Sequence, residues 1–131
     1  MEIHAAFMAL GAALCAYAAF LGLLRFKARR AGGHAAPYTW KRHLLSGRLM
    51  VLALTLGAFL GMREVLALNY TGPHATLDTL ALWGAFLMLV SGMMLASGKG
   101  KTWPLKKIHM LLGAATIICL AGAPIYLLAA R

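Results

Sequence analysis

Four long apolar runs dominate the chain, and each is separated from the next by a short polar or basic segment. We expect helices at about residues 3–24, 43–68, 74–97 and 108–130. Each run has roughly 22 to 26 residues and, at about 1.5 Å per residue, is long enough to cross a hydrocarbon core of about 30 Å. Because short connections make neighbouring helices antiparallel, the pattern predicts an all-α integral membrane protein, a single four-helix up-down-up-down bundle over residues 1–131.

The composition supports a membrane protein and argues against a nucleic-acid partner. Of the 131 residues, 62% are hydrophobic and 12% are charged, and the mean hydropathy is +0.77. A soluble domain of this size rarely has so few charges. The net charge of +10 would suggest nucleic-acid binding in a soluble chain, but here the basic residues lie in the gaps between apolar runs. Membrane topology demands that placement, so we predict a lipid bilayer as the surroundings and no nucleic acid.

The distribution of basic residues predicts the orientation. Six lie between residues 25 and 42 and others lie around residues 99–107, whereas the turn at residues 69–73 has none. Basic loops remain on the cytoplasmic side of a membrane. We therefore expect a bacterial inner-membrane protein with cytoplasmic basic loops and both termini periplasmic. The first apolar run is expected to remain as a helix, because Glu2 precedes it and basic residues follow it, opposite to the pattern of a signal peptide.

Two of the predicted helices begin with nearly the same sequence. The segments 39–43 and 102–109 both contain Thr-Trp, then a basic pair, then a histidine that opens an apolar run. Their tryptophans, Trp40 and Trp103, are interpreted as interfacial aromatic residues. The repetition indicates two helices that enter the membrane from the same face.

Four histidines open the four predicted helices. His4 and His74 belong to helices that begin outside, and His43 and His109 to helices that begin inside, so antiparallel packing sorts them into two layers. A single histidine at such a position is more often a packed or interfacial residue. Two pairs at matching depths call for a common explanation, because ligating groups inside a membrane are costly and usually functional. Two neutral imidazoles facing each other across a bundle are the axial ligands of a b-type haem, so we predict two haems with these histidines as iron ligands.

The helix faces beyond the histidines are predicted to be mostly small and apolar. Alternating steps of four and three residues follow one side of a helix. A macrocycle between helices needs the volume that small residues leave free, although close helix packing without any cofactor explains the same pattern. We call the residues on each of these four sides an inward row. The inward rows are His4, Met8, Gly11, Cys15, Ala18 and Gly22; His43, Gly47, Met50, Leu54, Gly57 and Gly61; His74, Asp78, Ala81, Ala85, Met88 and Gly92; and His109, Gly113, Thr116, Leu120 and Ala123.

Some charged and polar residues carry further expectations. Arg48, Lys106 and Lys107 are predicted to neutralise propionates of the inner haem, although the orientation rule alone explains most of these charges. Asp78, one turn into the third helix, either tunes the outer haem, relays a proton or is a wetted interfacial acid. His34 lies in the first basic loop and is interpreted as solvated.

The arrangement of one histidine per helix resembles the four-helix core of the cytochrome b561 superfamily. The resemblance covers nearly the whole chain and implies that His4 shares one haem with His74 while His43 shares the other with His109. The ascorbate-linked members have two flanking helices as well, so ascorbate as donor and ferric iron as acceptor are not carried over. The matching motifs are His-Ala-x-x-Met at residues 4–8 and His-x-x-x-Gly at residues 43–47 and 109–113.

Together these features predict a di-haem b-type electron-transfer protein that carries electrons between redox partners on opposite membrane faces. The expected partners are a soluble or membrane redox protein or the quinone pool, together with other subunits of an oxidoreductase. Two alternatives remain open. A quinol-oxidising cytochrome b subunit would need a polar pocket beside the outer haem, with Asp78, Tyr70 and Arg63 as candidates. A haem-free membrane anchor or assembly subunit would use its histidines and basic loops to bind another protein.

Overall fold

Four helices account for almost all of the structure, a computed structural model that describes residues 2–33, 37–68, 72–98 and 102–129. Each helix contains a stretch long and apolar enough to cross a membrane. Within these described ranges there is no β-strand, so the predicted four-helix membrane bundle is confirmed. The helices are α1 (Glu2–Arg30), α2 (Pro37–Leu68), α3 (Pro73–Ala96) and α4 (Thr102–Ala129).

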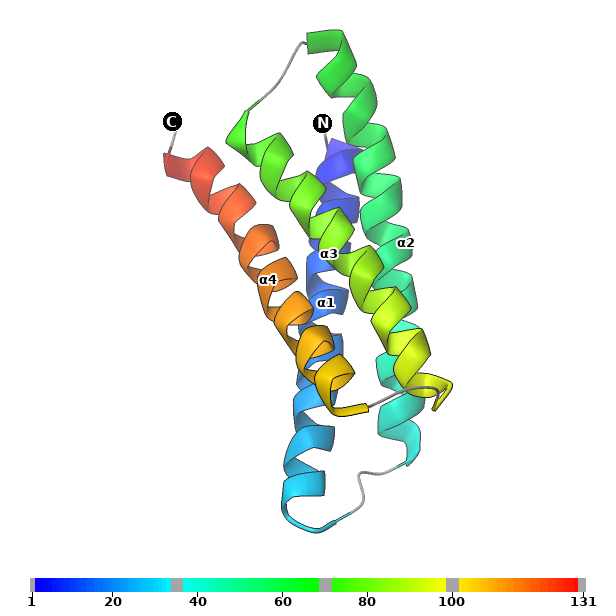
Figure 1. Ribbon diagram of the computed structural model, residues 1–131. Coiled ribbons are helices and arrows are strands. Elements are labelled where there is room, and N and C mark those ends of the chain that lie inside the picture. Colours follow the sequence, from blue (N-terminus) through cyan, green and yellow to red (C-terminus); the bar gives the residue numbers. More distant parts are fainter. Residues whose placement is uncertain (1, 34–36, 69–71, 99–101, 130–131) are drawn as a thin grey trace.

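The bundle consists of two helical hairpins. Neighbouring helices run in opposite directions, and α1 begins at the end of the bundle where α4 finishes (Figure 1). The closest packing is between α1 and α2 and between α3 and α4, while α2 with α3 and α1 with α4 touch less extensively. The helix α1 therefore lies diagonally across from α3, and α2 lies diagonally across from α4. Diagonal partners run in the same direction, so residues that open them lie at the same end of the bundle.

The core follows the inward rows predicted from the sequence. Ala81 and Ala85 have no exposed surface, and Leu54 and Thr116 are each 1% exposed. Small residues at these contacts let helix backbones approach closely, which is how helices associate where lipid weakens the hydrophobic driving force. The predicted inward faces are thus confirmed. The buried apolar members of the rows are Cys15, Ala18, Met50, Leu54, Ala81, Ala85, Leu120 and Ala123.

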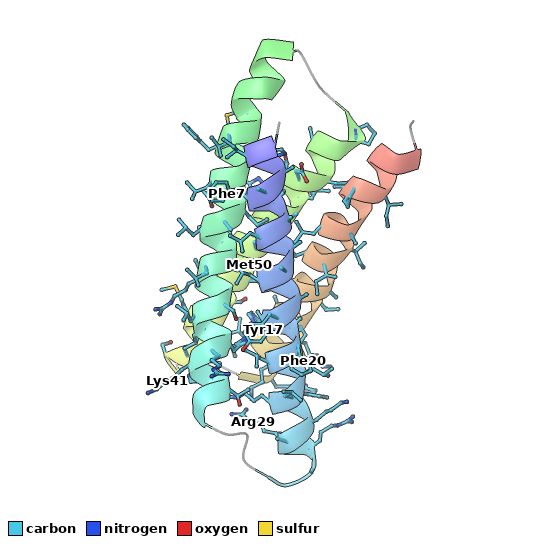
Figure 2. The ribbon with its side chains drawn as sticks, turned by 180° about the vertical axis from the view of Figure 1, so that it is seen from behind. Phe7, Tyr17, Phe20, Arg29, Lys41 and Met50 are labelled. Atoms are coloured by element: carbon cyan, nitrogen blue, oxygen red, sulfur yellow. The ribbon has the colours of Figure 1, made fainter. Side chains whose placement is uncertain are left out.

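The outer surface is apolar along the spans and basic at one end. Ile118 is 70% exposed and Phe20 is 55% exposed, as expected for side chains that face lipid. Figure 2 shows Arg29 and Lys41 at the end of the bundle where α1 is followed by α2. The hairpin of α1 and α2 extends beyond that of α3 and α4 at this end (Figure 1).

Three of the four helices are longer than predicted, and α3 has the predicted length. The segment 25–42 was expected as a loop, but α1 continues to Arg30 and α2 already begins at Pro37. Alanine, lysine and arginine favour a helix, and proline suits its first position, so neither helix has to end at the membrane boundary. The helix α4 also continues through Pro124, because neighbouring groups can satisfy the carbonyl that proline leaves unpaired. His34 lies outside the described residues.

Candidate haem site

The structure brings His43 of α2 and His109 of α4 together across the diagonal of the bundle. Their ring centroids are 6.2 Å apart, and the ring planes are inclined by 73°. Two imidazoles that bind one metal ion from opposite sides, each at about 2 Å, have centroids roughly 6 Å apart. The separation of His43 and His109 therefore suits two ligands of a shared metal centre.

The hydrogen bonds of the two rings leave the ligating nitrogens available. The Nδ1 atom of His43 lies 2.9 Å from the carbonyl oxygen of Ala18. A carbonyl only accepts, so Nδ1 carries the hydrogen and Nε2 keeps its lone pair. Metal-binding histidines usually donate their second ring nitrogen in this way, which fixes both tautomer and orientation.

His109 reaches the same state through a serine. Its Nδ1 atom lies 2.9 Å from the hydroxyl oxygen of Ser91. That hydroxyl donates its hydrogen to the carbonyl oxygen of Met88 at 3.1 Å. With its hydrogen on that carbonyl, the serine oxygen is free to accept from Nδ1–H of His109, the tautomer in which Nε2 keeps its lone pair.

Each of the two rings lies against a glycine of the neighbouring helix. A Cβ atom at Gly22 would lie 3.5 Å from Cε1 of His43, and one at Gly92 would lie 3.3 Å from Cε1 of His109. These glycines belong to the predicted inward rows of α1 and α3. Each hairpin thus holds its inner histidine against a glycine near the end of its own first helix.

Two further residues lie beside His43, one in contact with its ring and the other behind the first, and neither was assigned to the site from the sequence. The indole of Trp40 stacks on His43, with centroids 6.0 Å apart and planes inclined by 21°. The guanidinium carbon of the half-buried Arg25 lies 4.2 Å from the centre of the Trp40 ring. The available signal was spacing, because a tryptophan three residues before a histidine lies on the same side of a helix.

The predicted propionate partners occupy different faces. Arg48 and Lys107 are exposed, and Lys107 lies 4.7 Å from the ring centre of Trp103. At about 100° per residue, both point well away from the side of their helix that carries the histidine. Lys106 is half-buried and lies on the histidine side of α4. Among the three, Lys106 is the one whose position suits an anion at the inner layer.

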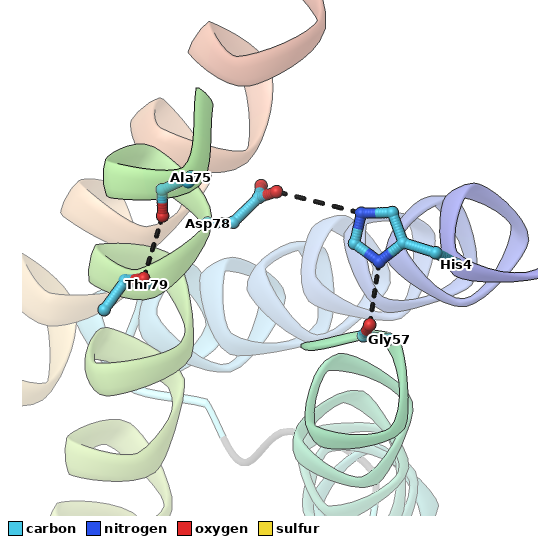
Figure 3. Close-up of polar contacts among 5 residues, drawn as sticks. All are labelled: His4, Gly57, Ala75, Asp78 and Thr79. Carbon is cyan, nitrogen blue, oxygen red and sulfur yellow. Dashed lines mark hydrogen bonds and ion pairs between the residues drawn. The ribbon is translucent and has the colours of Figure 1, made fainter. Parts of the chain in front are cut away.

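At the opposite end, His4 is held in the same manner as His43. Its Nδ1 atom lies 2.7 Å from the carbonyl oxygen of Gly57, and its Nε2 atom lies 4.0 Å from Oδ2 of Asp78 (Figure 3). The side chains of His4 and Asp78 are 18% and 15% exposed. A ligand on Nε2 of His4 would share this side of the ring with Asp78. The backbone of His74 lies one turn before Asp78 on α3, and its side chain lies outside the described part of the structure.

Two histidines suit a metal ion whose remaining ligands are supplied by a cofactor rather than by the protein. In the described part of the chain, no group of three or more histidine, cysteine or acidic side chains is placed to hold a metal ion. A bare zinc or calcium ion takes at least three protein ligands, whereas haem iron has four macrocycle nitrogens and needs two axial ligands. His43 and His109 fit the second case. Comparison with known protein families, with curated proteins and with solved structures finds no match to this chain.

Proposed function

We propose that this protein is a di-haem b-type electron carrier of the membrane, with one haem on His43 and His109 and the other on His4 and His74. The observation that carries the proposal is the inner pair, with centroids 6.2 Å apart and both Nδ1 atoms engaged in hydrogen bonds. With Nδ1 of each ring held by a hydrogen bond, Nε2 is the nitrogen that would bind iron. Bound haem would supply one-electron chemistry between its ferric and ferrous states.

The residues of the chain would do three things for electron transfer. The histidines hold the iron, the groups bonded to Nδ1 fix the rings, and the apolar core excludes water. Along α1, His4 and the Ala18 carbonyl that holds His43 are fourteen residues apart, or about 21 Å at 1.5 Å per residue. Two haems at these depths would place the irons on the order of 20 Å apart along the membrane normal.

The charge distribution supports an orientation and a class of partners. The end that carries Arg25 to Arg42 would face the cytoplasm of a bacterium, and both termini would face the periplasm. As a membrane carrier, the protein would take electrons from, and pass them to, redox proteins or the quinone pool. The arrangement would be that of a cytochrome b561-like core.

A haem count on purified protein tests the proposal. A reduced-minus-oxidised visible spectrum and a pyridine haemochrome assay are expected to give about two b haems per chain. The variants His4→Ala and His109→Ala are each expected to lose one haem, whereas His34→Ala, in the basic loop, is expected to lose none. A folded wild-type preparation without haem, after expression with ample haem supply, would rule out the proposal and favour a membrane anchor or assembly subunit.

One observation favours quinol oxidation as a second candidate function. Asp78 provides a hydrogen-bond acceptor beside His4, and quinol oxidation releases two protons with its two electrons. A quinol would then reduce the outer haem by one electron at a time. Inhibitor-sensitive oxidation of a short-chain quinol by the di-haem protein would support this function. Absence of that activity, with both haems present, would leave transfer between redox proteins.

A further inference from the structure

We infer that Ser91 is a positioning residue for His109 and sets the reduction potential of the inner haem independently of the outer one. The inference rests on the proposed function, because it concerns a haem bound by the inner pair. Ser91 is 5% exposed and uses both capacities of its hydroxyl, accepting from His109 and donating to Met88.

The two hairpins hold their inner histidines in a similar way, and the second hairpin has a serine in addition. In the first hairpin, the carbonyl of Ala18, four residues before Gly22, accepts directly from His43. In the second hairpin, the carbonyl four residues before Gly92 belongs to Met88, and it accepts from the serine in addition to forming a backbone hydrogen bond with His109. The position equivalent to Ser91 in the first hairpin is a buried leucine, Leu21. His109 therefore contacts a side-chain hydroxyl in addition to the backbone carbonyl, and His43 contacts only the carbonyl among its described hydrogen bonds.

The hydrogen-bond acceptor on Nδ1 changes the basicity of Nε2, the nitrogen that would bind the metal. A hydrogen bond from Nδ1 raises the basicity of the ring and favours the more highly charged ferric state. The hydroxyl of Ser91 is a stronger acceptor than an isolated alcohol, because it is polarised by its own donation to Met88. Loss of this acceptor is expected to raise the potential of the inner haem and to loosen the orientation of the His109 ring.

The chain offers a matched control in Ser46. This serine is also buried, at 3% exposed, and lies on α2 one turn after His43. Its hydroxyl donates to the backbone carbonyls of Arg42 and His43, at 2.8 and 3.1 Å, and contacts no described imidazole. Removal of either hydroxyl costs a comparable local hydrogen bond, but only Ser91 acts on a ring nitrogen.

Redox titration with electron paramagnetic resonance of the low-spin ferric haems tests the inference. The signals are first assigned to layers with His109→Ala and His4→Ala. Ser91→Ala is expected to shift the inner potential upward and to change the inner ferric signal, with the outer potential and signal unchanged. Ser91→Thr keeps a hydroxyl and is expected to restore both values, and Ser46→Ala is expected to change neither.

The outcomes separate this inference from the proposed function. Wild-type protein without haem overturns both. Two haems with the same inner potential in Ser91→Ala and wild type, or an equal shift in Ser46→Ala, overturn the role of Ser91 and leave the di-haem proposal standing. Selective loss of the inner haem in Ser91→Ala, with the outer haem retained and the threonine variant normal, supports the positioning role. Loss of both haems in Ser91→Ala and in Ser91→Thr would mark the site as structural and overturn the inference.

Discussion

The imidazole of His43 stacks on the indole of Trp40, with ring centroids 6.0 Å apart and planes 21° from parallel. The tryptophan thereby limits the rotation of a ring that the Ala18 carbonyl holds from its Nδ1 side. The repeated sequence at the start of α4 contains a second tryptophan, Trp103, which is 64% exposed. The two tryptophans match in the sequence and differ in what they contact.

This difference predicts unequal effects of substitution. Trp40→Leu is expected to remove the stacking and lower the inner haem content by about twofold or more, since an aromatic contact contributes about 1 kcal/mol. Trp103→Leu is expected to leave both haems in place. The haemochrome assay measures the outcome. Equal haem loss in the two variants would show a general interfacial role instead.

A charge change at Arg25 is expected to move the inner potential. A half-buried cation near a haem favours the ferrous state, which carries one positive charge fewer than the ferric state. Arg25→Gln is therefore expected to lower the inner potential by on the order of 40 mV, the one-electron equivalent of about 1 kcal/mol. Lys27→Gln, at an exposed position on the same turn of α1, serves as the control. A larger shift in the lysine variant would show that Arg25 has no special place near the site.

The outer layer is expected to be sensitive to a methyl group at Gly61. A Cβ atom there would lie 2.7 Å from Cε1 and Nδ1 of His4, whereas one at Gly22 would lie 3.5 Å from His43. The first distance requires the imidazole to move, and the second is ordinary contact. Gly61→Ala is thus expected to lose the outer haem while Gly22→Ala retains both, as visible spectra would report. Retention of the outer haem in Gly61→Ala would mean that His4 can shift and still bind iron.

Haem removal is expected to destabilise the contact between the hairpins. The inner pair joins α2 to α4, which otherwise lack close backbone contact in the described structure. A ligand at a thousandfold excess over its Kd stabilises the folded state by about 4 kcal/mol. Protein expressed under haem limitation should therefore melt at a lower temperature than the haem-replete form. Identical melting of the two forms, at different haem contents, would contradict a bridging role.

The inward faces were predictable because helical periodicity alone decides which residues share a side. Leu54, Ala81 and Thr116 were placed in the core by spacing from a histidine, and each is buried. The ends of the helices were not predictable in this way, because a helix whose apolar run ends at Leu24 can continue to Arg30 without losing its backbone hydrogen bonds. Hydrophobicity marks the membrane boundary and says little about where a helix stops.

The contacts around the histidines depended on information that one helix does not contain. The register between α1 and α2 decides which carbonyl contacts the Nδ1 atom of His43. The periodicity of a single helix does not determine that register. Ser91 and Arg25 were missed for the same reason, since each matters through a residue on another helix. The predicted roles of Arg48 and Lys107 relied on charge alone, and both side chains lie on exposed faces.

The division of the bundle into two hairpins bears on biosynthesis. His43 leaves the ribosome long before His109, and the hairpin of α1 and α2 can form while α3 and α4 are still being made. A half-synthesised chain holds one imidazole of each layer, so it offers incoming haem a single ligand at each depth. In the proposed di-haem protein, stable capture of haem would then await the second hairpin, so only a chain translated through α4 would bind both haems.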